Sequence, residues 1–248
     1  MAPYHFLVGT MNSPHVYTFS FTPPSSPGKL ASLKVAHKSD TVGSHSWLHL
    51  QTIRNKRILY ATAWTEPPSL VAYAIHSPTD IRYINSVETA ARSGYVCASD
   101  RAVYSAGGAV GEVFSIDAST GGFALSSSSS NQRQKPLQEV DFVGSSEKQE
   151  NNGSVMDFGG LRHGAHSADL SPNGKALYVA DIGRNCIWDF PVDPKTGMLG
   201  EQKKYEAPRE GDGPRHTHPH PNGRHLYCVQ EHSSMVDVYK VADDSVSL

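Results

Sequence analysis

Three side chains capable of acid–base chemistry or anion binding stand at related points of a repeated stretch. His166 precedes Arg215 by the same interval that separates Pro172 from Pro221, and Glu231 stands in the second copy of the repeat, one residue beyond the position that matches Asp181. Histidine transfers protons near neutral pH, and the arginine fork binds a carboxylate through two parallel hydrogen bonds. Together with a carboxylate, these groups would suit a site for a small anionic substrate.

Each of the three residues also has an ordinary structural interpretation. A histidine before a turn is usually structural or solvated, an arginine after Gly-Pro usually lies on the surface, and a glutamate at the end of a strand is usually solvated. Position along the chain therefore favours a site only if the fold brings the three together.

The element that would position them is the repeat itself. Each copy contains a short strand, a Pro-Asn-Gly turn, a second strand, a polar break and a third strand, over 166–190 and again over 215–239. The Asn-Gly pair supplies the positive φ that a tight hairpin needs. Repetition at ~40–50 residues is typical of β-propeller blades. In a propeller the first strands meet around a central channel, so we expect His166 and Arg215 to point towards one mouth.

The same repeat extends towards the N-terminus. Tyr60, Tyr104, Tyr178 and Tyr227 mark one place in the second strand of four repeats. Before them, three strands over residues 4–10, 15–21 and 30–36 form a repeat that lacks its opening strand, and the last repeat stops at residue 248 before it is complete. The expected fold is an all-β propeller with about five blades in an incomplete ring.

A polar, low-complexity insertion is expected at about residues 124–155 of this single domain, which spans 1–248. It contains the serine run Ser126–Ser130 and the stretch Glu147–Gly153. Such segments bury too little apolar surface to offset the entropy of ordering the chain. We predict a surface loop, with a strand inside it at Leu137–Val143.

Composition limits the classes of partner. The formal net charge of −2 leaves no electrostatic footprint for nucleic acid or an anionic membrane, and no apolar run is long enough to span a bilayer. The N-terminus shows no basic region before its apolar run, so a cytoplasmic location is expected. Cys97, Cys186 and Cys228 are widely spaced and predicted to be buried and free.

A histidine-rich stretch raises the alternative of a metal site. His216, His218 and His220 alternate along the chain, which would place their rings on one face of a strand. Pro219 and Pro221 interrupt the pattern, however, and no aspartate or cysteine stands at ligand spacing. We therefore expect no metal, and interpret these histidines as surface or channel-lining residues.

Several phrases resemble the lactonase and muconate-cyclase family of seven-bladed propellers. Similarity is weak over residues 88–158. The Gly-Asp-Gly-Pro-Arg phrase is also shared with the 6-phosphogluconolactonase branch, whereas the opening strand and two later phrases resemble the carboxymuconate-cyclase branch more closely. The phrases are Tyr4-His-Phe-Leu-Val-Gly-Thr, Ser46-Trp47, Ser77-Pro-Thr-Asp-Ile81, Gly164-Ala-His-Ser and Gly211-Asp-Gly-Pro-Arg.

This resemblance implies roles for the three candidate residues. His166 matches the family's active-site histidine, Arg215 its first arginine and Glu231 its glutamate. The family places a second arginine in a later blade, beyond this chain. The implied reaction is a cofactor-independent cycloisomerisation of 3-carboxy-cis,cis-muconate to 3-carboxymuconolactone in aromatic catabolism, with Arg215 binding a carboxylate and His166 and Glu231 sharing the proton transfer.

Two alternatives stay open at this point. One is a sugar-lactone hydrolase of the 6-phosphogluconolactonase kind. The other is a non-catalytic, truncated propeller that acts as a binding scaffold. Because an unclosed ring would expose apolar blade faces, self-association is also expected.

Overall fold

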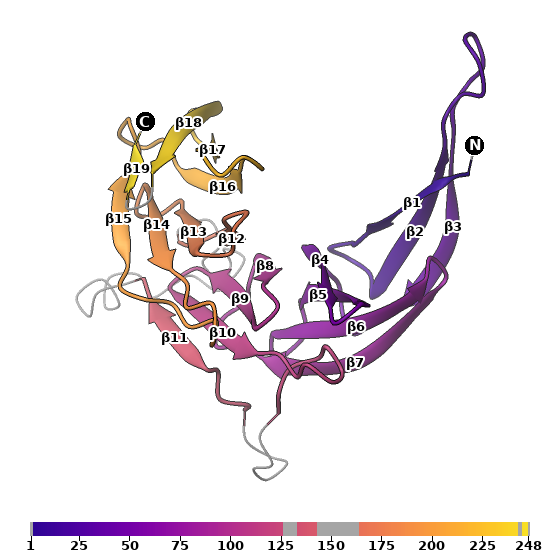
Figure 1. Ribbon diagram of the computed structural model, residues 1–248, viewed down its shortest axis with the longest axis horizontal. Helices are drawn as coiled ribbons and strands as arrows, with labels where there is room; N and C mark the ends of the chain where they lie inside the picture. The colour runs from indigo at the N-terminus through magenta and orange to yellow at the C-terminus, as the bar shows by residue number, and fades with distance from the viewer. Residues whose placement is uncertain (1, 126–132, 143–163, 243–244, 248) are drawn as a thin grey trace.

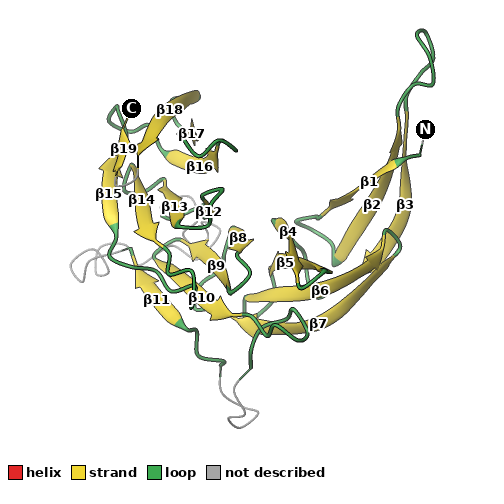
Figure 2. Cartoon of the chain, viewed as in Figure 1, coloured by secondary structure: helices red, strands yellow, loops and turns green. Residues whose placement is uncertain are grey.

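The computed structural model describes residues 2–125, 133–142, 164–242 and 245–247. Strands and loops make up all of these ranges (Figure 2), as the all-β prediction requires. The strands form five antiparallel sheets, and within each sheet they are ordered as they are in the chain. Each strand thus pairs antiparallel with the strand that follows it in the chain, in most cases through a short hairpin.

The first sheet has three strands: β1 (Tyr4–Val8), β2 (His15–Thr22) and β3 (Ser32–Asp40). The second contains β4 (Leu48–Ile53), β5 (Lys56–Ala63), β6 (Ser69–Ser77) and β7 (Asp80–Glu88). The third contains β8 (Tyr95–Ala98), β9 (Ala102–Gly107), β10 (Val110–Ser115) and β11 (Gln138–Asp141). The fourth contains β12 (Asp169–Leu170), β13 (Ala176–Asp181), β14 (Cys186–Pro191) and β15 (Lys203–Glu206). The fifth contains β16 (Pro214–Pro219), β17 (His225–Gln230), β18 (Met235–Ala242) and β19 (Ser245–Ser247).

The sheets are arranged around an arc, with β4, β8, β12 and β16 on its inner side and β7, β11 and β15 on its outer side (Figure 1). The arc is open between the sheet of β1 and the sheet of β16. This is the incomplete ring expected from the repeats. The expectation that the last repeat stops short of completion is wrong, because β19 pairs with β18 and gives the fifth sheet its fourth strand.

The tyrosines used to align the repeats are confirmed as equivalent. Tyr60 lies in β5, Tyr104 in β9, Tyr178 in β13 and Tyr227 in β17, which are the second strands of the four-stranded sheets. The hairpin turns before two of these strands contain Gly174 and Gly223, with φ of 69° and 71°. Only the left-handed region allows this tight reversal, and glycine enters it without a Cβ clash.

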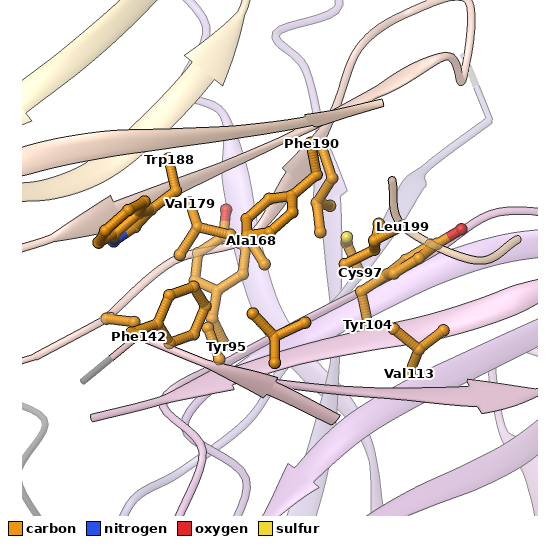
Figure 3. Close-up of a cluster of buried hydrophobic side chains, with 14 of the residues drawn as sticks. Tyr95, Cys97, Tyr104, Val113, Phe142, Ala168, Val179, Trp188, Phe190 and Leu199 are labelled. Carbon is orange, nitrogen blue, oxygen red and sulfur yellow. The ribbon is translucent and has the colours of Figure 1, made fainter. Parts of the chain in front are cut away.

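The core consists of layers between neighbouring sheets. Figure 3 shows the layer between the third and fourth sheets, where Tyr104 and Phe142 from one side meet Val179, Trp188 and Phe190 from the other. Burying each large apolar side chain contributes about 1.5–3 kcal/mol. This packing sets the angle at which successive inner strands face the channel.

Two tyrosine hydroxyl groups also link one sheet to the next. Tyr60 Oη donates to the carbonyl of Gly121 at 2.6 Å, and Tyr104 Oη donates to the carbonyl of Gly197 at 2.9 Å. Both glycines close turns that follow the third strand of the next sheet, with φ of 83° and 79°. The same bond in two successive sheets fixes the spacing between neighbours.

Most of the predicted insertion at about 124–155 falls outside the described residues. Within the part that the structure describes, β11 confirms a strand inside it, at Gln138–Asp141. The three cysteines are free and buried, as predicted. Among the described residues, no helix has the length and hydrophobicity needed to cross a membrane.

Candidate active site

The backbone of two neighbouring sheets positions the three candidate residues. His166 precedes β12, where its N–H donates to the carbonyl of Ala180 at 2.8 Å. Arg215 lies in β16. Glu231 directly follows β17, and its N–H donates to the carbonyl of Gly213 at 2.8 Å. The structure therefore holds all three at the same end of the fourth and fifth sheets.

Arg215 and Glu231 form an ion pair, with Arg215 Nε 2.6 Å from Glu231 Oε2. The pairing register shifts between Pro214 and His216, and such a bulge re-aims the side chain of the residue inside it. The two side chains are 40% and 39% exposed. An exposed pair of this kind contributes at most about 1 kcal/mol to folding. Arg215 can therefore exchange its partner for the carboxylate of a ligand at little cost.

His166 lies deeper than the ion pair. Burial, together with the charge of Arg215 and the neighbouring His216, lowers the pKa of His166 to about 3. Its ring centroid is 5.1 Å from that of His216. Its Nδ1 is buried and has no hydrogen-bond partner among the residues that the structure describes. His166 is thus a neutral imidazole beside Arg215.

Three further rings meet next to His166, and sequence reasoning did not assign them to the site. Trp47 and Tyr95 are stacked, with centroids 3.8 Å apart and planes inclined by 26°. The ring of His216 is 5.4 Å from Trp47 and 5.6 Å from Tyr95. Burial and the charge of Arg215 lower the pKa of His216 to about 4. The rings come from the second, third and fifth sheets, and we refer to Trp47, Tyr95 and His216 as the aromatic cluster.

The strand register, counted from the repeat tyrosines, could have revealed this cluster. Tyr95 pairs with Ala106 and His216 pairs with Val229, and these partners stand two residues after Tyr104 and Tyr227. Trp47 bonds through its carbonyl to the N–H of Thr62, which stands two residues after Tyr60. The three rings thus share one position of the repeat.

Asp169 connects three sheets beneath the cluster. Tyr95 Oη donates to Asp169 Oδ1 at 2.7 Å, and Thr217 Oγ1 donates to Asp169 Oδ2 at 2.9 Å. Burial raises the pKa of Asp169 to about 7, against the opposing effect of these donors. The carboxyl group holds Tyr95 and the strand of Arg215 in fixed relation.

The histidines that were considered as metal ligands in the sequence lie in different environments. His216 joins the aromatic cluster, whereas His220 contacts His225 and Tyr227, with ring centroids 6.2 Å and 6.0 Å away. No group of three potential metal ligands occurs among the described residues.

A surface hollow lies between the Pro-Asn-Gly turns of the fourth and fifth sheets, with Lys175 and Arg224 in its lining. It is at the opposite ends of β13 and β17 from Asp181 and Glu231. The hollow is therefore separate from the candidate site.

Comparison with known proteins settles the family. A family model described as lactonase, 7-bladed beta-propeller, matches residues 5–248. The chain belongs to the seven-bladed lactonase family. Within this family the chain is 43% identical over 247 residues to Muconate cycloisomerase 1 of Cutaneotrichosporon cutaneum. The match covers 98% of the chain and 61% of that relative, so the chain spans less than two thirds of its length.

Two solved structures with the same fold are named as lactonases. A putative 6-phosphogluconolactonase from Bacteroides fragilis superposes with a TM-score of 0.74 at 20% identity, over 99% of this chain and 66% of that one. The periplasmic gluconolactonase of Pseudomonas aeruginosa superposes with a TM-score of 0.71 at 19% identity, over 99% and 67%. At these identities the likeness establishes the lactonase fold alone.

Proposed function

We propose that the protein is a cofactor-independent cycloisomerase that converts 3-carboxy-cis,cis-muconate to 3-carboxymuconolactone. The observation that carries the proposal is the exposed Arg215–Glu231 pair beside the partly buried, neutral His166. The 43% identity to a relative named as a muconate cycloisomerase supports this reaction over others of the family.

The reaction needs a held carboxylate and a transferred proton. One carboxylate oxygen of the substrate forms a bond to a carbon of the diene, the carbon–carbon double bond opens, and the neighbouring carbon takes up a proton. No atom is lost, and no oxidant or reductant is required. Arg215 binds a substrate carboxylate in place of Glu231, through a charge-assisted pair.

The substrate itself prepares the proton donor. In the free protein, partial burial and the charge of Arg215 lower the pKa of His166 and keep it neutral. A bound tricarboxylate opposes that charge and raises the pKa of His166, so the imidazole gains a proton as the substrate binds. His166 and Glu231, which Arg215 has released, then share the proton transfer to carbon. His166 and Glu231 both lie next to Arg215, where the substrate carboxylate binds, so little motion is needed for the proton transfer.

An assay with two substrates tests the proposal. The purified protein is given 3-carboxy-cis,cis-muconate, whose conversion removes the absorbance of the conjugated diene, and separately 6-phosphogluconolactone, whose hydrolysis releases acid. We expect the diene absorbance to disappear, and His166→Ala to suppress that loss. Hydrolysis of the sugar lactone without loss of the diene would favour the hydrolase, and inactivity towards both would favour a binding scaffold.

A further inference from the structure

The aromatic cluster lies beside the candidate residues His166 and Arg215. His216 adjoins Arg215 in β16, and its ring is 5.1 Å from that of His166. Trp47 and Tyr95 continue the same layer of rings from the second and third sheets. The charged pair and the cluster are therefore contiguous across the inner strands.

The cluster offers ring faces more than polar groups. The hydroxyl of Tyr95 is occupied by Asp169 at 2.7 Å, and the Tyr95 side chain is buried. The backbone N–H of Trp47 is bonded to Thr62 Oγ1 at 3.0 Å, which holds the indole in place. Trp47 and His216 are only partly buried, so parts of their rings are accessible.

The fourth sheet carries no ring at this position of the repeat. Ser167 occupies the corresponding place before β12, where it bonds the N–H of Thr217 at 3.2 Å. A small polar side chain thus satisfies the same repeat position in the fourth sheet. The large rings in the other three sheets fill space between the inner strands, next to the groups that bind an anion.

We propose that Trp47 and His216, with the buried Tyr95 stacked behind Trp47, form an aromatic floor that selects planar, unsaturated carboxylates over the puckered rings of sugar lactones. This inference rests on the proposed anion site at Arg215. A conjugated polycarboxylate presents a flat π surface that packs in parallel against a ring, whereas a saturated ring holds its carbon atoms out of one plane. Contacts between π faces add to the charge-assisted pair without competing for it.

The size of the effect follows from measured aromatic pairs. Such pairs contribute an affinity difference of about 2- to 12-fold beyond the burial of area. A planar ligand should therefore bind more tightly, by that factor, than a puckered ligand with the same charges in the same positions.

Calorimetric binding with two matched probes tests the floor. Benzene-1,2,4-tricarboxylate is planar, and cyclohexane-1,2,4-tricarboxylate carries the same carboxylates on a puckered ring. We expect wild type to prefer the planar probe by about 2- to 12-fold. Trp47→Phe, which keeps a ring face, should retain the preference, and Trp47→Leu should abolish it.

The outcomes separate the floor from the anion site. Trp47 also packs against two core layers, so the folding of Trp47→Leu is checked by thermal unfolding. If that variant does not fold, the binding preference of His216→Leu tests the floor instead. Equal affinity of wild type for both probes, or an unchanged preference in the leucine variants, overturns the floor and leaves the anion site standing. Binding of neither probe, with no conversion of the muconate, overturns the proposed function and the floor together.

Discussion

The hydroxyl of Tyr95 in the third sheet donates a 2.7 Å hydrogen bond to Asp169 in the fourth, and this carboxyl group also accepts a bond from Thr217 in the fifth. One carboxyl group thus joins three sheets below the candidate site. Both of these donors are neutral hydroxyl groups, which compensate the charge of Asp169 less than a guanidinium would.

This arrangement predicts a pH-dependent contribution to stability. The pKa of Asp169 is raised from 3.8 to about 7 in the folded protein, so between these values the folded state holds the proton more firmly than the unfolded state. The contribution of Asp169 is therefore fully present below about pH 4 and is lost as the pH rises through about 7. Because His166 and His216 have lowered pKa values and act in the opposite sense, the difference between wild type and Asp169→Asn isolates the effect.

Urea unfolding of both proteins from pH 4.5 to 8 measures this difference. We expect the stability of wild type relative to Asp169→Asn to fall with rising pH over this range. Asp193→Asn is the control, because the lowered pKa of Asp193 keeps it ionised throughout. If the difference in unfolding free energy between wild type and Asp169→Asn did not change with pH, the raised pKa of Asp169 would be contradicted.

Removal of the guanidinium at Arg215 should impair catalysis. Arg215→Ala loses a charge-assisted pair worth about 1.5–3 kcal/mol, which corresponds to roughly a ten- to hundred-fold lower kcat/KM for the muconate. Arg215→Lys should recover little, since an ammonium group cannot form two parallel bonds. Arg224→Ala, at the remote hairpin turn, should keep the wild-type value. A wild-type rate in Arg215→Ala would exclude Arg215 from substrate binding.

Ligand binding should be accompanied by proton uptake. Free His166 is neutral at pH 7 because its pKa is about 3, and a bound tricarboxylate raises that pKa. The affinity for benzene-1,2,4-tricarboxylate should therefore decrease as the pH rises from 6.5 to 8, where the probe itself is ionised. Calorimetry in buffers with different ionisation enthalpies counts the protons. His166→Ala should reduce the uptake, and it should lower kcat more than it changes KM; equal uptake in both proteins would argue against His166.

The bond between Tyr104 and Gly197 should stabilise the interface of the third and fourth sheets. Tyr104→Phe removes the hydroxyl donor at 2.9 Å and leaves the Gly197 carbonyl unpaired. The expected loss is about 1–3 kcal/mol in the free energy of unfolding. Tyr83→Phe, in which the lost hydroxyl is exposed, should cost less than about 0.5 kcal/mol. Similar values for the two variants would show that the bond between sheets adds nothing.

The open ends of the arc should promote self-association. Exposed apolar side chains occur on the sheets at both ends of the arc. Phe6 in β1 is 45% exposed, and Val236 and Val238 in β18 are 58% and 46% exposed. We propose that these faces cover one another between copies. Sedimentation should show oligomers that Val236→Lys with Val238→Lys dissociates, with Leu50→Lys, another exposed apolar position, as control. A compact monomer for wild type would contradict the proposal.

The sequence alone determined the first three strands of each repeat, their hairpins and the equivalence of His166 with Arg215, because these depend on local turn chemistry and on a repeat that can be counted. It did not predict the outer strands β7, β15 and β19. It also placed Tyr60, Tyr104, Tyr178 and Tyr227 in equivalent strands. Each of these features is encoded within a few tens of residues.

The tertiary structure alone decided which side chains surround the candidate residues. Trp47, Tyr95 and His216 lie in three separate repeats, and their stacking depends on the angle between sheets that the core layers impose. Likewise, the unusual pKa values of His166 and Asp169 come from burial by residues distant in the chain. Turn signals and alternation specify each strand pair, but the packing of one sheet against the next specifies the environment of the site.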